Sequence, residues 1–205
     1  LLAGLAQMRR FAEFDYDITA VTIDPGFNGV PNNYEAVARL CEKLDVPFSL
    51  VHTQIGEIVF DIRKEPNPCS LCANMRRGAL HDAAKAAGCN KLALGHHNDD
   101  VIETFIMNLF NEGRIGCFSP KTHLDRKDIT VIRPLVLAPE SQIISACNRN
   151  NLEVVKSVCP ADKTTTRQKT KEFLRDMEHK DKGFKLRMFT ALRKSGVDGW
   201  GYPDK

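Results

Sequence analysis

Two short motifs in this sequence contain the residue types that bind metals and phosphates. The first is CSLC at residues 69–72, which places Cys69 and Cys72 directly after a proline-rich stretch. A CxxC pair at the start of a helix suits metal binding or redox chemistry, because the helix dipole and nearby arginines such as Arg76 favour the thiolate form. Two ligands do not complete a metal site, so the pair needs further donors.

Cys159 is the candidate for the third ligand. It follows an apolar run that we expect to form a strand, and Pro160 ends that strand directly after it. Three thiolates would leave one iron of a cubane cluster open for substrate or sulfur. Two other interpretations of the CxxC pair stay open, namely a thioredoxin-like redox pair and an incidental pair without a role. The odd count of seven cysteines argues against a secreted disulfide framework.

The second motif is GHHNDD at residues 95–100, where we expect a turn from a strand into a helix. Gly95 lets a ligand approach the backbone closely, and free N–H groups at a helix start can bind a phosphate. A carboxylate at this turn, from Asp99 or Asp100, can hold Mg²⁺. The motif therefore indicates a nucleotide site. The alternative is that the aspartates only cap the helix, while His96 and its neighbour are solvated.

Apolar, β-branched runs alternate with helical patterns along the chain, and these elements must position the two motifs. This order is typical of α/β proteins, in which crossover helices join parallel strands. We expect strands at residues 18–23, 48–52, 91–94, 129–133 and 152–155, helices at 34–44, 74–87, 99–110 and 140–150, and loops at 25–33 and 115–127. The sequence thus predicts an open parallel sheet with helices on both faces.

The candidate site residues follow the predicted strands at the point where each strand ends. Asp24 follows the first strand and Thr53 the second, while Gly95 and Cys159 follow two later ones. The carboxyl ends of the strands form the ligand crevice in open parallel sheets. We therefore expect these residues to meet at one edge, with Asp24 in the nucleotide site.

Composition and charge limit the class of protein. Of 205 residues, 42% are hydrophobic and 27% are charged, which suits one soluble α/β domain at residues 1–160 with a helical extension at 161–205. Residues 163–194 contain eleven lysines and arginines against four acidic residues, a local charge of +7. This basic stretch suits an RNA partner, but charge alone favours a solvated helix face.

Membrane and secretory signals are missing from the sequence. No apolar run approaches the roughly 20 residues that cross a bilayer, and the first ten residues lack the order of a signal peptide. We therefore expect a cytoplasmic protein without a membrane partner.

The motifs, taken in order, resemble the tRNA 2-thiocytidine synthetase (TtcA-like) group of the PP-loop ATPases. The resemblance rests on CSLC at 69–72, RRG at 76–78, GHHNDD at 95–100, IRPL at 132–135 and CP at 159–160. It implies an enzyme that binds ATP and Mg²⁺, takes sulfur from a donor such as a cysteine desulfurase, and thiolates a tRNA cytidine. It also implies a [4Fe-4S] cluster held by Cys69, Cys72 and Cys159, and a homodimer as in relatives.

The resemblance also implies a reaction and a set of roles. Attaching AMP to the C2 oxygen of cytidine, with release of pyrophosphate, makes that oxygen a leaving group that sulfur can displace. In this hypothesis Asp99 or Asp100 binds the metal ion and the phosphate, and the planar guanidinium of Arg76 stabilises the negative charge of the phosphate. The remaining candidate nucleotide-binding residues are Asp24, Gly95 and His96.

The sequence departs from this group at its start. The SGGKDS phosphate loop of the family is absent, and the opening residues LLAGL resemble the helix behind that loop. We expect that a strand and the phosphate loop precede this stretch in a longer chain. Two alternatives stay open, which are another PP-loop tRNA modification (2-thiouridine or lysidine formation) and a non-catalytic iron–sulfur or zinc-binding protein.

Overall fold

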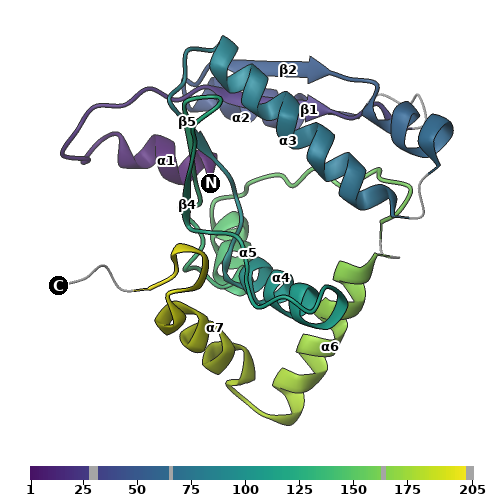
Figure 1. Cartoon of the computed structure of the whole chain (residues 1–205). Coiled ribbons are helices and arrows are strands. Elements are labelled where there is room, and N and C mark those ends of the chain that lie inside the picture. The colour runs from purple at the N-terminus through teal and green to yellow at the C-terminus, as the bar shows by residue number, and fades with distance from the viewer. Residues whose placement is uncertain (28–31, 65–66, 163–164, 202–205) are drawn as a thin grey trace. The chain divides into compact units, whose positions relative to one another are not determined.

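The computed structural model describes residues 1–27, 32–64, 67–162 and 165–201. The chain, shown in Figure 1, forms two compact units. The first unit contains Leu1–Leu92, Asp125–Ile129 and Asn150–Asp162. The second contains Ala93–Leu124, Thr130–Arg149 and Lys163–Lys205. The division into a catalytic domain at 1–160 and an extension at 161–205 stays a prediction.

The first unit is built on two parallel strands, β1 (Ala20–Asp24) and β2 (Phe48–His52). Their register pairs Asp24 with His52, so both strands end at the same edge. Two parallel neighbours need a crossover connection, and α2 (Glu35–Lys43) lies in the segment between them. The unit also contains α1 (Leu2–Met8), the π-helical segment η2 (Glu57–Arg63) and α3 (Pro68–Ala86).

A buried cluster connects the end of this parallel pair to α3. Its fully buried members are Phe27, Ile55, Val59 and Cys72. The helix α3 packs against β1 and η2, and it begins with Pro68 at its first helical position. Proline is favoured there because its fixed φ suits the helix and its missing N–H would have no helical partner.

The second unit contains most of a three-stranded sheet in the order β3-β5-β4. Its strands are β3 (Lys91–Ala93), β4 (Lys121–Leu124) and β5 (Ile129–Ile132). The N–H of Arg133 donates to the carbonyl of Pro120, and the ring of His123 lies 3.2 Å from the Thr130 hydroxyl. These pairs identify β4 and β5 as an antiparallel hairpin.

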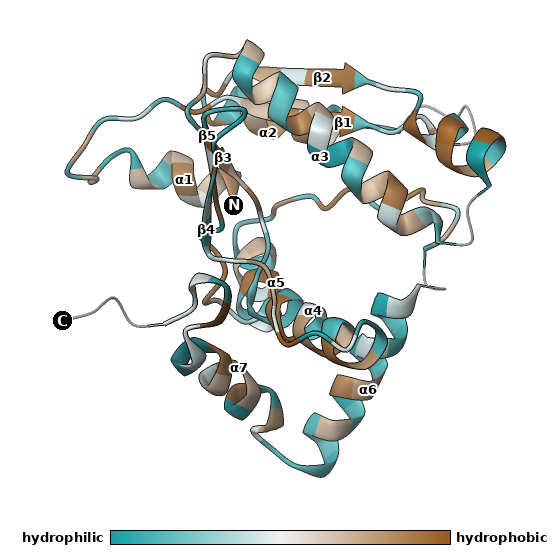
Figure 2. Ribbon diagram, viewed as in Figure 1, coloured by the Kyte–Doolittle hydropathy of each residue, from teal (hydrophilic) through white to brown (hydrophobic). Residues whose placement is uncertain are grey.

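Four helices complete the second unit: α4 (Asn98–Asn111), α5 (Glu140–Arg149), α6 (Thr166–Lys180) and α7 (Phe184–Ser195). Val101, Ile102 and Ile106 recur on one face of α4 and are buried against Leu174 and Phe189. Figure 2 shows α6 and α7 alternating between hydrophilic and hydrophobic residues, as expected of amphipathic helices with one buried face.

The α/β class is confirmed, and so are most of the predicted elements. The strands predicted at 18–23, 48–52, 91–94 and 129–133 and the helices predicted at 34–44, 99–110 and 140–150 are present within a few residues of their predicted bounds. The helix predicted at 74–87 begins earlier, at Pro68, and includes both cysteines of the CxxC pair. The loop predicted at 25–33 includes residues 28–31, which lie outside the described residues.

Two predictions about strands are wrong. Residues 152–155 form no strand, and Val154 is 72% exposed there. A β-branched run becomes a strand only when a neighbour pairs with its backbone and covers its side chains. The loop predicted at 115–127 contains β4, whose polar sequence KTHL becomes a strand through pairing with β5.

None of the helices within the described ranges is both long enough and apolar enough to cross a membrane.

Candidate functional site

The shared edge of β1 and β2 fixes the buried carboxylate of Asp24. One oxygen lies 3.1 Å from Nδ1 of His52, and the other accepts hydrogen bonds from the Tyr34 hydroxyl and the Gly26 N–H, both at 3.2 Å. The N–H and the hydroxyl of Thr53 donate to the Asp24 carbonyl at 3.0 and 2.8 Å. The predicted meeting of Asp24 and Thr53 is therefore confirmed.

Two glycines at this edge have a structural requirement that the sequence analysis missed. Gly26 has a φ of +67°, and a Cβ atom there would lie 2.7 Å from the Thr53 carbonyl oxygen. A Cβ atom at Gly56 would lie 2.7 Å from the Gly26 carbonyl oxygen. The N–H of Gly56 also donates to the Pro25 carbonyl at 2.7 Å. The backbone turns after β1 and β2 thus pack directly on each other, and the only sequence signal was a glycine shortly after each strand.

The three candidate ligand cysteines belong to the first unit and come from two distant segments. Cys69 and Cys72 lie at the start of α3, and Cys159 packs against the buried cluster that contains Cys72. Cys69 is exposed, Cys72 is buried and Cys159 is half-buried. All three are free thiols. The structure therefore brings Cys159 to the CxxC pair.

The expected preference of the CxxC pair for the thiolate form is wrong for the protein alone. Burial raises the pKa of Cys72. It also raises the pKa of Cys69, whose thiol is partly covered although the residue as a whole is exposed, and the charge of Cys159 raises both further. Arg76 acts in the opposite direction, and lowers both pKa values. Burial outweighs the arginine, so both thiols are protonated at neutral pH.

The cysteines fit a metal cluster by their chemistry. Thiolates are the ligands of iron–sulfur clusters, and a bound metal ion deprotonates a coordinating thiol outright. Among the described residues, no three or more His, Cys, Asp or Glu side chains are arranged to hold a metal ion. The structure thus gathers soft donors in one place without setting them in a ligating arrangement.

Arg76 connects the thiols with the edge of the parallel pair. Its exposed guanidinium, on α3, lowers the pKa values of both CxxC cysteines and acts in the same direction on Tyr34, the partner of Asp24. Burial nevertheless raises the pKa of Tyr34, so its hydroxyl stays protonated and donates to Asp24. A positive charge therefore lies near both the cysteines and the Tyr34 hydroxyl that donates to Asp24.

The GHHNDD motif forms the turn from β3 into α4 in the second unit. His97 is the N-cap, and its Nδ1 accepts a hydrogen bond from the Asp100 N–H at 3.4 Å. The Asp100 carboxylate accepts in return from the His97 N–H at 2.9 Å. This reciprocal pair is a capping box, so the capping role is confirmed for Asp100.

Both aspartates of the turn are also paired with cations. Asp100 lies 3.0 Å from Arg167, and Asp99 lies 2.8 Å from Lys185. Burial alone would raise the pKa of Asp99, but hydrogen bonds from the Glu140 N–H and from Lys185 lower it below its usual value. Asp99 is therefore ionised at neutral pH.

Two features of the same turn fit a polar ligand. A Cβ atom at Gly95 would have no other atom within 4 Å, so the backbone there borders open space. Nδ1 of His96 is buried and has no hydrogen-bond partner among the described residues. Burial lowers the pKa of His96, so its ring is neutral and offers one donor and one acceptor.

The structure thus divides the predicted site residues between the two units. Asp24, Arg76 and the three cysteines belong to the first unit, while Gly95, His96, Asp99 and Asp100 belong to the second. Within each unit the predicted residues lie together. The expected meeting of both groups at one edge stays a prediction.

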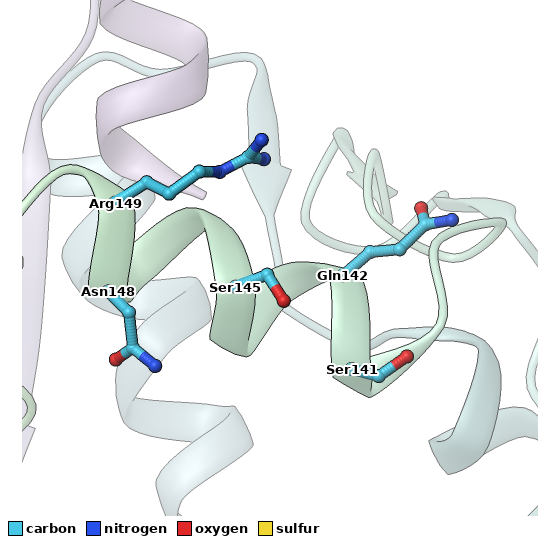
Figure 3. A pocket seen from close by; sticks show the side chains of 5 residues that line it. All are labelled: Ser141, Gln142, Ser145, Asn148 and Arg149. Carbon is cyan, nitrogen blue, oxygen red and sulfur yellow. The ribbon is translucent and has the colours of Figure 1, made fainter.

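A depression along α5 is distinct from these residues. It has a volume of about 630 Å³ and is lined by Ser141, Gln142, Ser145, Asn148 and Arg149, which all project from one helix (Figure 3). None of the predicted site residues lines it, so it is not the proposed nucleotide site.

Comparison with known proteins agrees with the motifs. The PP-loop domain family matches residues 1–177. The tRNA-cytidine(32) 2-sulfurtransferase of Pelobacter propionicus is 38% identical over 195 residues, which cover 94% of this chain and 72% of that protein. The protein of the same name from Citrifermentans bemidjiense is 36% identical over 196 residues, covering 94% and 76%.

A solved structure has a similar fold. The U34-tRNA thiolase NcsA from Methanococcus maripaludis, with its [4Fe-4S] cluster, matches with a TM-score of 0.75 and 24% identity. The match covers 93% of this chain and 65% of the thiolase chain. At this identity the likeness shows the fold alone, whereas the family follows from the sequence matches. The chain belongs to the PP-loop family and, within it, to the tRNA 2-thiocytidine synthetase (TtcA-like) group.

Proposed function

We propose that this chain thiolates a tRNA cytidine in an ATP-dependent reaction, by adenylating the C2 oxygen and replacing it with sulfur. The observation that carries the proposal is that Cys159 packs against the buried cluster of Cys72, at the edge where Asp24 ends β1. The names of the similar proteins, tRNA-cytidine(32) 2-sulfurtransferases, support the choice of substrate.

Cys69, Cys72 and Cys159 would hold a [4Fe-4S] cluster. When bound, such a cluster with three protein ligands supplies an iron without a protein ligand for the sulfur that is transferred. The cluster named with the similar thiolase from Methanococcus maripaludis supports this assignment. The role of this chain's own residues is to gather three thiols in an apolar setting, with Arg76 reducing their mutual repulsion.

The nucleotide site is proposed at the strand-to-helix turn of the second unit. The open backbone at Gly95 and the unpaired nitrogen of His96 would bind the nucleotide. Mg²⁺ would bind at the turn of Asp99 and Asp100, because their carboxylates are hard oxygen donors.

The phosphate chemistry needs positive charge where negative charge develops. Attack of the cytidine oxygen on the α-phosphate forms the new P–O bond, and the bond to pyrophosphate breaks. Arg76 would stabilise the charge on the phosphate oxygens, because its guanidinium donates in a planar fork. Sulfur then attacks C2 and AMP leaves with the original oxygen.

The partners belong to the same proposal. The tRNA would bind the exposed cations of α6 and α7, and Arg175, His179 and Lys180 line a hollow of about 260 Å³ there with Asp176. Phosphate contacts of this kind supply most sequence-independent affinity. A cysteine desulfurase or another donor would supply the sulfur. We further propose a homodimer that acts in the cytoplasm, where tRNA is modified.

Nucleoside analysis of tRNA tests the activity. A strain lacking its own enzyme is complemented with the full-length protein, with Cys72→Ser, with Cys159→Ser, or with the matched control Cys147→Ser, which alters a half-buried free thiol of α5. We expect 2-thiocytidine with wild type and the control, and none with the other two variants. Full thiolation by Cys159→Ser would contradict the assignment of the three cysteines.

A further inference from the structure

The C-terminal helices direct cations toward the carboxylates at the start of α4. Nη1 of Arg167, on α6, lies 3.0 Å from Oδ1 of Asp100 and 3.4 Å from Oε2 of Glu103. Its Nη2 donates to the hydroxyl of Thr104 at 3.3 Å. A single guanidinium therefore spans the first turns of α4 and binds three side chains of one face.

Lys185 of α7 holds the neighbouring carboxylate. Its Nζ lies 2.8 Å from Oδ1 of Asp99, whose other oxygen accepts from the Glu140 N–H at 2.7 Å. The backbone of Lys185 is fixed as well, because the Glu178 carboxylate accepts from the N–H groups of Gly183 and Lys185 at 2.8 and 2.9 Å. The carboxylate of Glu178 thus sets the start of α7 and with it the position of Lys185.

Lys171 of α6 extends the network to α5, since its Nζ lies 2.7 Å from Oε1 of Glu140. The three cations face four carboxylates, namely Asp99, Asp100, Glu103 and Glu140. The side chains of Asp99 and Asp100 are only 12% and 19% exposed. Solvent and salt screen such pairs much less than pairs on an open surface.

Both oxygens of each aspartate have a protein partner in this arrangement, and a carboxylate keeps further lone pairs that a metal ion can use. Asp100 is held by Arg167 on one side and by the His97 N–H on the other, and Asp99 by Lys185 and the Glu140 N–H. A carboxylate held at both oxygens keeps one orientation. Loss of the cation would leave a mostly buried charge without its partner and free to rotate.

We propose that Arg167 and Lys185 are positioning residues of the nucleotide site, which hold Asp100 and Asp99 in their working orientation. This inference rests on the proposed function, because it assigns the two aspartates to that site. It makes α6 and α7 a structural part of the nucleotide site in addition to any RNA-binding surface they provide.

Arg167 and Lys185 differ from the other cations of the basic stretch. Lys169 on α6 and Lys194 on α7 are exposed, and their side chains have no partner in the part of the chain that the structure describes. These two lysines remain available to RNA phosphates, whereas Arg167, although 43% exposed, and Lys185 are paired with carboxylates of α4. They are therefore matched controls, one on each helix.

The experiment compares full-length Arg167→Met, Arg167→Lys and Lys185→Met with the controls Lys169→Met and Lys194→Met. We expect kcat for tRNA thiolation to fall about 10-fold to 100-fold in Arg167→Met and Lys185→Met, as for a misplaced catalytic group. RNA affinity should fall no more than in the controls. Arg167→Lys should fold and should keep a higher kcat than Arg167→Met, because lysine supplies the positive charge without the planar guanidinium.

Each outcome separates this inference from the proposed function. Wild-type kcat in Arg167→Met and Lys185→Met would overturn the positioning roles, and so would a loss confined to RNA affinity. A wild-type protein without thiolation activity would refute the proposed function instead. In that case the inference is tested by measuring the affinity for ATP with Mg²⁺. Arg167→Met and Lys185→Met should each bind about 10-fold more weakly than wild type, and affinities equal to wild type would overturn the inference.

Discussion

Glu103 should make the stability of this protein fall as pH rises toward neutrality. Its side chain is buried on α4, and burial raises its pKa from 4.5 to about 7, although Arg167 acts in the opposite direction. In the unfolded chain the same group loses its proton near its ordinary value. Between these two pKa values the folded state therefore holds a proton that the unfolded state releases, which favours unfolding as pH rises.

The size of this effect follows from the two pKa values. One pKa unit corresponds to about 1.4 kcal/mol, so the folded state loses about 3 kcal/mol between pH 4 and pH 8 through this one group. Glu103→Gln keeps the shape and removes the titration. Raising the pH from 4 to 8 should therefore shift the difference in unfolding free energy between Glu103→Gln and wild type by about 3 kcal/mol in favour of the variant.

Urea unfolding at pH 4 and pH 8 measures this difference. The matched control is Glu112→Gln, which removes an exposed carboxylate at the end of the same helix. If the difference in unfolding free energy between Glu103→Gln and wild type is the same at pH 4 and pH 8, the raised pKa of Glu103 and the burial that causes it are refuted.

Further predictions concern the glycines, the thiols and the basic helices. Gly56→Ala should lower the unfolding free energy by about 2 kcal/mol or more, because its Cβ meets the Gly26 carbonyl at 2.7 Å. Gly78→Ala on α3, with open space around it, should raise the unfolding free energy by about 0.5–1 kcal/mol in the same urea titration. Cys69 should react with iodoacetamide at pH 8 more slowly than free cysteine, and Arg76→Ala should slow it further, because burial raises the pKa and the arginine lowers it. Binding of tRNA should weaken steeply between 50 and 200 mM salt, by about 10³-fold if six phosphates are contacted, and a salt-independent affinity would exclude the basic surface.

The fold was predictable where local pattern and tertiary packing agree. The apolar face of α4 recurs at helical spacing and is buried as expected. The residues of β1 are all buried or half-buried, and β2 places half-buried Phe48, Leu50 and Val51 beside exposed Ser49 and His52. The segment expected to form a strand at 152–155 contains two valines, but no strand in the described part of the chain pairs with it. The polar strand β4 depends on pairing with β5, which its own residues do not indicate.

The site was predictable as far as each motif carries its own chemistry. The CxxC pair, the turn at 95–100 and Asp24 could be recognised locally. Cys159 packs against the cluster of Cys72 as expected, although the strand predicted to bring it there is absent. The pairing of Arg167 and Lys185 with the turn could not be predicted, since these cations lie far along the chain among many other lysines and arginines. The raised thiol pKa values depend on burial, which spacing does not report.

The central claim is that Cys69, Cys72 and Cys159 together hold one iron–sulfur cluster. Iron and sulfide analysis with Mössbauer spectroscopy on anaerobically purified full-length protein tests it most directly, comparing wild type with Cys159→Ser and with the control Cys147→Ser. We predict four irons and four sulfides per chain in wild type and the control, and loss of the cluster in Cys159→Ser. Zinc or no metal in wild type, or an intact cluster in Cys159→Ser, would contradict the claim.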